Sequence, residues 1–463
     1  MVVFNPYFQL PNAIDPDNFY GSIGMVHQLL QRISASNPRA VELLGMPGMG
    51  KTNLLRYLRH PDGALKRNTQ SLQSPFRENP HRLFLVLVEY RLMPPETHPF
   101  QYLYERLCME YEEYQGLFEA ERGSKLPSLE KEDFSDREYG EVGVLAASRI
   151  TEGIKRLATC EQRIRPVFLL DDFDLAVRKE VISKEGVDKA RPWRQYVSLV
   201  LAVEKRIVEV NAEVAASAFF QVIPLVRLGG LTEDEARELL TEPVEGFFPR
   251  EDVNLVMRLA GGHPHLLILA GSALWSVREH LNLLHVPQQP LSDEETPVLQ
   301  GRLQQDFSRV FDLYWDRQEQ QQKEALIAST TSSILAKQHK AVLASLMELD
   351  LVAFSPADKA FHPFSPLFAE YVAQKREPSV FTASLDLTQL ESDLFEYLSQ
   401  RPNEIITFEE LWKRVWNQEV GEDETQIRRP IQVTVSRLRK KLELTGNDIV
   451  SIRDQGYRFV MPA

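Results

Sequence analysis

Residues 45–52 read Gly-Met-Pro-Gly-Met-Gly-Lys-Thr, and this segment constrains the fold more than any other part of the chain. It follows the apolar run of residues 41–44 and precedes the helical pattern of residues 53–58. The glycines allow backbone N–H groups to turn inward, and the start of the following helix adds positive potential at the same point. The pattern therefore predicts a loop that cradles phosphate between a buried strand and a helix.

Each part of this loop has an expected role in binding a nucleoside triphosphate. The ammonium of Lys51 is expected to meet the β- and γ-phosphates, and the hydroxyl of Thr52 to ligate Mg²⁺. An ordinary glycine-rich turn is the alternative, and the strand and helix on either side argue against it. The residues expected to bind nucleotide here are Gly45, Met46, Pro47, Gly48, Met49, Gly50, Lys51 and Thr52.

A phosphate loop needs an acidic partner for the metal, and residues 168–172, Phe-Leu-Leu-Asp-Asp, provide one at the end of an apolar run. We expect Asp171 to hold Mg²⁺ through water. Asp172 is the candidate catalytic residue, because it is placed to orient or deprotonate an attacking water. A solvated carboxylate at a strand end is the alternative for Asp172, and Asp174 is either a loop cap or a group behind the site.

Short apolar runs alternate with helical stretches in the first half of the chain, and they predict an α/β domain with a parallel sheet over residues 1–230. The expected strands are residues 41–44, 83–88, 167–170 and 196–203. Two polar segments, residues 68–80 and 110–141, are expected to be surface insertions rather than framework.

Helical periodicity replaces the strands from about Leu231 onward. Thr232 is expected to cap a helix, with Glu235 three residues later as its partner. Residues 343–371 then read helix, strand pair, helix, and linkers are expected at residues 286–295 and 376–384. The predicted units are a helical lid domain at residues 231–285, a first winged-helix domain at residues 296–376 and a second winged-helix domain at residues 385–463.

Several features occur in the order found in STAND-class ATPases, and the chain resembles this family over residues 7–371. These are signal-transduction ATPases related to replication-initiator and NLR-type ATPases. The features are Phe19-Tyr-Gly21, the phosphate loop, Asp171-Asp172, the strand leading into Glu204-Lys-Arg206, residues 228–240 and Gly262-His-Pro264.

The resemblance implies that Phe19, Tyr20 and Gly21 contact the adenine and that Pro264 packs against the base. A purely structural turn between helices is the alternative for Pro264. Ser22 stands where the family often has arginine. Ser365 stands where eukaryotic relatives place a histidine near the diphosphate, and His362 is the candidate substitute.

The C-terminal residues predict a basic helix followed by a hairpin. Residues 428–443 form the helix, with Pro430 in its first turn, and residues 449–460 form a hairpin that turns at residues 454–456. Its expected buried stripe is Ile431, Val435, Leu438 and Leu442. A basic helix and a basic wing suit major-groove reading and phosphate contact. The expected DNA-binding residues are Arg428, Arg429, Gln432, Ser436, Arg437, Arg439, Lys440, Arg453 and Arg458.

Residues 425–443 together with Gly-Tyr-Arg-Phe at 456–459 resemble the winged-helix effector domain of OmpR/PhoB-type response regulators. The resemblance covers residues 384–461, and only residues 379–385 represent the family's N-terminal small sheet. The alternative is a winged helix that contacts proteins through a charged, solvated helix face.

The composition of the chain excludes some classes of protein. A formal net charge of −13 argues against a protein that coats nucleic acid non-specifically. Two cysteines, Cys108 and Cys160, exclude a disulfide framework and are expected to be buried thiols in a reducing cytosol. The first lysine or arginine is Arg32, and no apolar run approaches the ~20 residues of a membrane span. We therefore expect a cytoplasmic protein that does not interact with membranes.

These features favour an ATP/ADP-dependent, STAND-type molecular switch that uses Mg²⁺ and hydrolyses ATP slowly. Exchange of ADP for ATP is expected to open the chain, to promote a homo-oligomer and to present the C-terminal winged helix to double-stranded DNA for transcription regulation. One alternative is a defence or stress sensor whose winged helix binds a protein partner or trigger. Another is a replication-initiator-like ATPase that remodels DNA.

Overall fold

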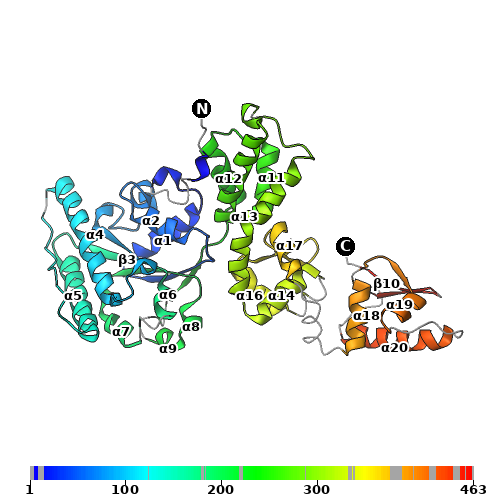
Figure 1. Cartoon of the computed structure of the whole chain (residues 1–463). Coiled ribbons are helices and arrows are strands. Elements are labelled where there is room, and N and C mark those ends of the chain that lie inside the picture. Colours follow the sequence, from blue (N-terminus) through cyan, green and yellow to red (C-terminus); the bar gives the residue numbers. More distant parts are fainter. Residues whose placement is uncertain are drawn as a thin grey trace. The chain divides into compact units, whose positions relative to one another are not determined.

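The computed structural model consists of two compact units, Met1–Leu303 and Gln304–Ala463 (Figure 1). The structure describes all residues except 1–4, 9–14, 124, 179–181, 183, 218–219, 221–222, 287, 332–335, 337–338, 376–387, 400, 417–423, 442–448, 454 and 461–463.

A five-stranded parallel sheet, of which β3 is labelled in Figure 1, forms the centre of the first unit. Its strand order is β2-β3-β4-β1-β5. Its strands are β1 (Ala40–Leu44), β2 (Leu83–Glu89), β3 (Arg165–Asp171), β4 (Ser198–Val203) and β5 (Leu225–Arg227). The predicted parallel α/β sheet is confirmed. The sequence did not indicate β5, which is only three residues long and has one buried position.

Nine helices surround or cover this sheet in the described part of the first unit, and the first, second, fourth, fifth and sixth of them contact its strands. They are α1 (Ile23–Ile33), α2 (Lys51–Arg59), α3 (Ala64–Arg67), α4 (Pro99–Arg122), α5 (Tyr139–Thr159), α6 (Phe173–Arg178), α7 (Lys184–Lys189), α8 (Ile207–Val210) and α9 (Ala212–Ala215). The phosphate-loop helix, α2, follows β1 after the loop at residues 45–50. Because all five strands are parallel, the segments that follow β1, β3 and β4 emerge at one edge of the sheet.

The two predicted surface insertions are wrong, because both segments contribute to the core. Residues 110–122 continue α4, where Tyr111 and Phe118 are buried. In the other segment Leu72 and Phe76 are buried, and the guanidinium of Arg165 lies 4.5 Å from the centre of the Phe76 ring. The many acidic residues of the segment 110–141 obscured the apolar spacing of α4 in the sequence.

The two cysteines were both expected to be buried. Cys108 is buried, whereas Cys160, which follows α5, is only half-buried.

Three helices, α10 (Glu233–Thr241), α11 (Arg250–Ala260) and α12 (Pro264–His280), follow the sheet. Thr232 and Glu235 form the predicted capping box at the start of α10. A buried ion pair joins Arg278 of α12 to Asp252 of α11 at 2.7 Å. Arg278 also donates to the carbonyl of Gln289, so part of the predicted linker is held against these helices.

Helix α13 (Thr296–Asp316) begins in the first unit and ends in the second. The second unit continues with α14 (Gln320–Thr331), α16 (Lys340–Glu348), β6 (Val352–Ser355), β7 (Ala360–Pro363) and α17 (Pro366–Gln374). This is the predicted order of helix, strand pair and helix. Ser365 is buried and accepts a hydrogen bond from the N–H of Phe368, which caps α17, while His362 lies 2.5 Å from a carboxylate oxygen of Asp358.

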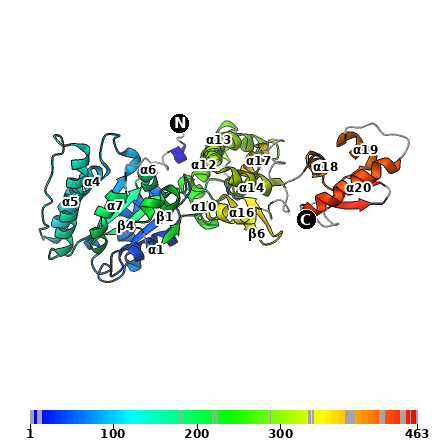
Figure 2. The same cartoon turned by 90° about the horizontal axis from the view of Figure 1, so that it is seen from below.

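The chain ends in a winged helix, at the end of the ribbon marked C (Figure 2). It contains a three-stranded antiparallel sheet in the order β8-β10-β9. Its elements are α18 (Gln389–Ser399), β8 (Ile405–Thr407), α19 (Phe408–Arg414), α20 (Glu424–Lys441), β9 (Ile449–Ile452) and β10 (Gly456–Phe459). The predicted linker at 376–384 and the short stretch at 379–385 both lie outside the described residues.

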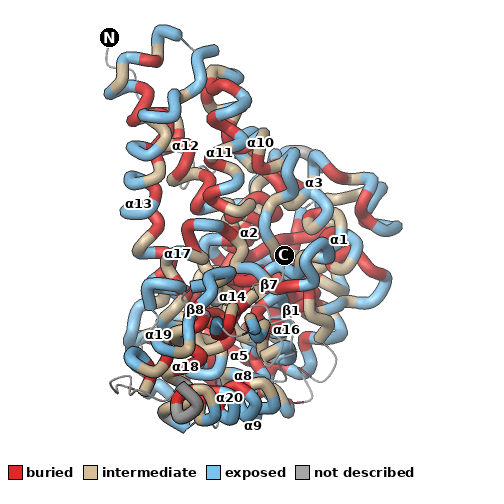
Figure 3. The backbone as a smooth tube through the Cα atoms, turned by 90° about the vertical axis from the view of Figure 1, so that its right-hand side faces the viewer, coloured by how far each residue is buried: buried red, intermediate tan, exposed pale blue. Residues whose placement is uncertain are grey.

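Helix α20 carries the predicted buried stripe at Ile431, Val435 and Leu438, whereas Leu442 lies outside the described residues. The expected start is wrong, because α20 begins at Glu424 and Pro430 lies inside the helix. Buried Ile427 extends the stripe by four residues toward the N-terminus, which explains the earlier start. Exposed positions recur along α20 (Figure 3).

Candidate nucleotide site and DNA interface

The loop between β1 and α2 has the backbone that its glycines predict. Gly48 and Gly50 have φ angles of +79° and +90°, in the left-handed region that favours glycine. A Cβ atom at Gly48 would lie 2.9 Å from Cε1 of His263, so this position also lacks space for a side chain. The backbone can therefore approach a phosphate group closely at this loop.

Lys51 lies inside the loop. Its ammonium donates to the carbonyl of Gly45 at 2.6 Å and to that of Met46 at 3.3 Å, and the residue is 7% exposed. Burial lowers the pKa of Lys51, while the carboxylates of Glu204 and Asp171 act in the opposite direction. The side chain is thus a buried cation held beside the backbone that surrounds the candidate phosphate site.

Thr52 and Asp171 are brought together from α2 and the end of β3. The Thr52 hydroxyl donates to Oδ2 of Asp171 at 2.6 Å, and Asp171 is 2% exposed. Burial raises the pKa of Asp171 to about 6. Its other oxygen, Oδ1, is buried and has no hydrogen-bond partner. A buried carboxylate with a vacant lone pair fits a cation, so both residues suit a Mg²⁺ site.

No group of three or more His, Cys, Asp or Glu side chains suited to a metal occurs in the part of the chain that the structure describes. A Mg²⁺ ion at Thr52 and Asp171 would therefore take most of its oxygen ligands from phosphate and water, as is usual for this ion.

Asp172 is held by an arginine that the sequence did not indicate. Nε of Arg91 lies 2.9 Å from Oδ2 of Asp172, and Nη2 of Arg91 lies 3.9 Å from a carboxylate oxygen of Glu204. Arg91 lies in the short helix that follows β2, and Glu204 follows β4. The candidate catalytic carboxylate is thus ion-paired at the same edge of the sheet as the phosphate loop.

Asp174 lies in the first turn of α6 and is 2% exposed. Its carboxylate accepts a hydrogen bond from Arg178 at 3.0 Å. Burial, followed by the nearby charge of Glu204, raises the pKa of Asp174. It is a buried group behind the candidate nucleotide site.

One pocket brings together most of the residues expected to contact the base. Phe19, Tyr20 and Pro264 line it with Met49 and Gly50 of the loop. The Phe19 ring stacks on Tyr57, with centroids 4.0 Å apart and an interplanar angle of 3°. Gly21 has a different place, because its φ is +84° and an added Cβ would lie 2.3 Å from Cδ2 of Leu231. It allows the close approach of two segments beside the pocket.

His263 connects the phosphate loop to α12, a contact that the Gly-His-Pro pattern did not reveal. Its Nδ1 accepts the N–H of Leu266 at 3.3 Å and caps α12, and its Nε2 lies 3.3 Å from the carbonyl of Pro47. The residue is 1% exposed, and burial lowers the pKa of His263 to about 3. His263 is therefore a neutral imidazole whose Nε2–H donates to the loop.

The residues expected to bind DNA fall into two groups. The first group is exposed on α20 and consists of Arg429, Gln432, Ser436, Arg437 and Lys440, which we call the α20 face. Their spacing by three and four residues places them on one side of the helix.

The second group consists of Arg428, Arg439, Arg453 and Arg458, some of which pack against other residues of the C-terminal winged helix. The Arg428 guanidinium lies 5.2 Å from the Phe408 ring centre, and Arg439 donates to the carbonyl of Ile449. Arg453 is exposed and Arg458 is half-buried. Arg439 thus holds the wing, which gives it a structural role beside any contact with DNA.

Residues 382–459 match the family model described as "Transcriptional regulatory protein, C terminal". The C-terminal module is a winged helix of this transcriptional-regulator type. No curated protein matches the chain. Among the helices of the described residues, none has the length and apolar character needed to cross a membrane.

Several solved structures are similar to the chain. A Walker-type ATPase of Pyrococcus abyssi is 13% identical, with a TM-score of 0.47, and the match covers 77% of this chain and 96% of that one. The ORC2 protein of Aeropyrum pernix in its ADP form is 12% identical, with a TM-score of 0.43 and coverage of 76% and 91%. The ORC1 protein of Aeropyrum pernix in complex with DNA is 17% identical, with a TM-score of 0.40 and coverage of 80% and 95%.

Proposed function

We propose that the chain is a nucleotide-controlled regulator that binds ATP or ADP in its first unit and double-stranded DNA through its C-terminal winged helix. The observation that supports this most directly is the combination of two sites in one chain. Thr52 lies 2.6 Å from Asp171 beside a phosphate-loop backbone, and residues 382–459 match a transcriptional-regulator family.

In this proposal the loop and Lys51 bind the phosphates, and Phe19, Tyr20 and Pro264 contact the base. Thr52 and Asp171 hold Mg²⁺, which supplies positive charge opposite the phosphate oxygens. Asp172 orients the attacking water. Its ion pair with Arg91 keeps it in place and occupies its Oδ2 atom, which supports slow hydrolysis of the kind a switch requires.

The His263 contact supports control of conformation by nucleotide. His263 caps α12 and also donates to Pro47, so a change in the loop backbone reaches α12 directly. A ligand can shift such an equilibrium only through contacts that differ between the two states. We therefore assign the difference between ATP and ADP to the γ-phosphate at this loop, with opening and homo-oligomerisation in the ATP state, as in a STAND-type switch.

DNA binding by the full-length protein tests the proposal. A variant with Arg429, Arg437 and Lys440 changed to alanine removes the cations of the α20 face. The matched control changes three exposed lysines elsewhere, Lys125, Lys155 and Lys359, and therefore loses the same charge. We expect weaker duplex binding in a retardation assay for the α20 variant alone. Equal binding by wild type and both variants would indicate a module that contacts proteins.

A further inference from the structure

A second cavity lies in the first unit, away from the residues of the nucleotide site. Its volume is about 380 Å³, within the range of roughly 300–1,000 Å³ that small-molecule sites occupy. Its floor is apolar and includes Leu83, Phe84 and Leu85 at the start of β2, together with Phe118 of α4. Because the phosphate loop follows the carboxyl end of β1, this cavity lies at the opposite end of the parallel sheet.

Two apolar side chains at the sides of this cavity are accessible. Leu117 of α4 is 48% exposed, although it lines the cavity, and Leu65 of α3 is half-buried. An apolar ligand in the cavity would remove both side chains from water. This burial would contribute to the binding free energy in proportion to the apolar area covered.

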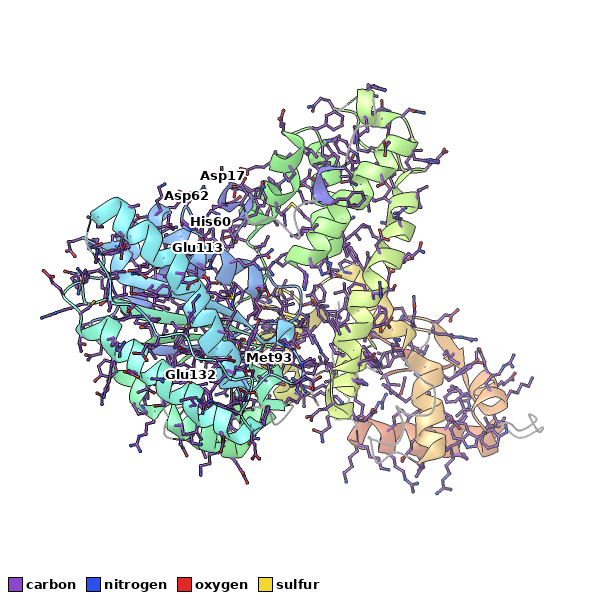
Figure 4. All side chains as sticks on the ribbon, turned by 60° about the vertical axis from the view of Figure 1, so that its left-hand side comes forward. Asp17, His60, Asp62, Met93, Glu113 and Glu132 are labelled. Carbon is purple, nitrogen blue, oxygen red and sulfur yellow. The ribbon has the colours of Figure 1, made fainter. Side chains whose placement is uncertain are left out.

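The mouth of the cavity is acidic. Figure 4 shows His60, Asp62 and Glu113, which line the cavity, beside α4. Asp17 lies next to them and lines an adjoining pocket with His60 and Asp62. The side chains of Asp17, Asp62 and Glu113 are 75%, 61% and 55% exposed. Lys66 and Arg67 are the exposed cations there, and the more buried Arg59 is shared between Glu110 and Glu113. The residues that line the cavity itself include three carboxylates, Asp62, Glu110 and Glu113, and two cations, Arg59 and Lys66, so the field at the mouth favours a positive group.

We propose that this cavity is an effector site for an amphipathic amine. The apolar body of the ligand lies against Leu83, Phe84 and Phe118, and its protonated amine lies at the mouth between Asp62 and Glu113. The amine supplies the charge that the mouth lacks, and the body fills the apolar floor.

The wall of this cavity is connected to the pocket lined by Phe19, Tyr20 and Pro264, which we call the base pocket. Leu65 and Lys66 of α3 line the cavity, and the next residue, Arg67, lies 2.5 Å from the Asp17 carboxylate and 3.3 Å from the Pro16 carbonyl. Pro16 lines the base pocket together with Phe19. A ligand that displaces α3 therefore changes the base pocket. Because this ion pair is exposed, we expect only about a two- to fivefold change in nucleotide affinity.

Amine binding is independent of the proposed function, whereas the effector role rests on nucleotide binding at the phosphate loop. The test uses the full-length protein and two probes of the same size, 4-phenylbutylamine and 4-phenylbutanoate. Affinities are measured by ligand-observed NMR, and ADP affinity is measured separately with and without saturating amine.

Two variants and one control probe the cavity. Leu65→Trp fills the wall and should abolish binding of both probes. Glu113→Gln should remove most of the preference for the amine. Glu112→Gln is the matched control. The carboxylate of Glu112 is next to Glu113 in the sequence, but it pairs with Lys131 and does not line the cavity. Circular dichroism and ADP binding show whether each variant is folded.

We expect the amine to bind the wild type about tenfold more tightly than the carboxylate, because attraction at the mouth replaces repulsion. Binding of neither probe, equal binding of both, or binding that survives in folded Leu65→Trp would overturn the site. Amine binding with unchanged ADP affinity would overturn the effector role. If the wild type did not bind ADP at all, the proposed function would be contradicted. The amine measurement would still test the cavity independently.

Discussion

The nucleotide site and the α20 face both depend on basic side chains, but their charges have opposite surroundings. Lys51 is 7% exposed and lies among carbonyls and carboxylates, whereas Arg437 is exposed on α20. A buried cation is fixed in one position by its neighbours, and an exposed one acts through its field and through the release of counterions. We therefore expect single substitutions to abolish nucleotide binding but to weaken DNA binding in steps.

The largest effect is expected for Lys51→Ala. Removing a cation from a buried phosphate site should cost about 2–5 kcal/mol of binding free energy, or roughly 30-fold to several-thousand-fold in affinity. Titration with a fluorescent ATP or ADP analogue measures the loss, and circular dichroism checks the fold. Lys155→Ala, at an exposed position of α5, is the control and should bind as the wild type does. Unchanged affinity in folded Lys51→Ala would remove the phosphate-loop assignment.

An intermediate effect is expected for Asp171→Asn in the absence of nucleotide. Burial raises the pKa of Asp171 from 3.8 to about 6, so ionisation of this carboxyl opposes folding. That cost is absent below pH 4 and fully present above pH 6. The variant should therefore be about 1–3 kcal/mol more stable than the wild type at pH 8 and about equal at pH 4.

Urea denaturation across this pH range measures the difference, with exposed Asp136→Asn as the control. Mg²⁺ together with nucleotide should stabilise the wild type more than the Asp171 variant, since a bound cation reverses the cost of the buried charge. A variant that is less stable than the wild type at pH 8 would contradict this account. It would show that the protein stabilises the ionised Asp171 carboxylate without a metal.

The smallest effects are expected on α20. Arg437→Ala should weaken duplex binding roughly tenfold and lower the salt slope by about one, because one exposed cation is lost. Arg439→Ala should instead lower the thermal stability of the module, since Arg439 donates to the Ile449 carbonyl of the wing. Binding at several salt concentrations and a melting curve for each variant separate the two roles. Identical behaviour of the two variants would contradict the division of the basic residues into two groups.

The sequence predicted the parts of the fold that depend on local pattern. The phosphate loop, the strand before it and the acidic end of β3 are each encoded in a few consecutive residues. The buried stripe of α20 follows from spacings of three and four residues. Helix α4, which extends into the segment 110–141, had a signal of the same kind, because Tyr104, Leu107, Tyr111 and Phe118 are all buried on it. The acidic composition of the segment obscured that signal.

Contacts between distant segments were not predictable in this way. Arg91 meets Asp172 only because β2 and β3 are paired in register, with Glu89 opposite Asp171. The contact of His263 with Pro47 depends on where α12 begins relative to the loop. The pairing of the strands determines the first contact and the position of α12 determines the second, and no single segment encodes either.

Binding of the full-length protein to duplex DNA in its two nucleotide states tests the account most directly. DNA affinity and solution mass are measured with Mg²⁺ and either ADP or a non-hydrolysable ATP analogue, with Lys51→Ala as the control that should not respond. A coupling of about 1–3 kcal/mol predicts a 5- to 150-fold higher affinity, and a larger mass, with the ATP analogue. Equal affinity and equal mass in the two states would contradict the switch and would indicate an ATPase that binds DNA constitutively.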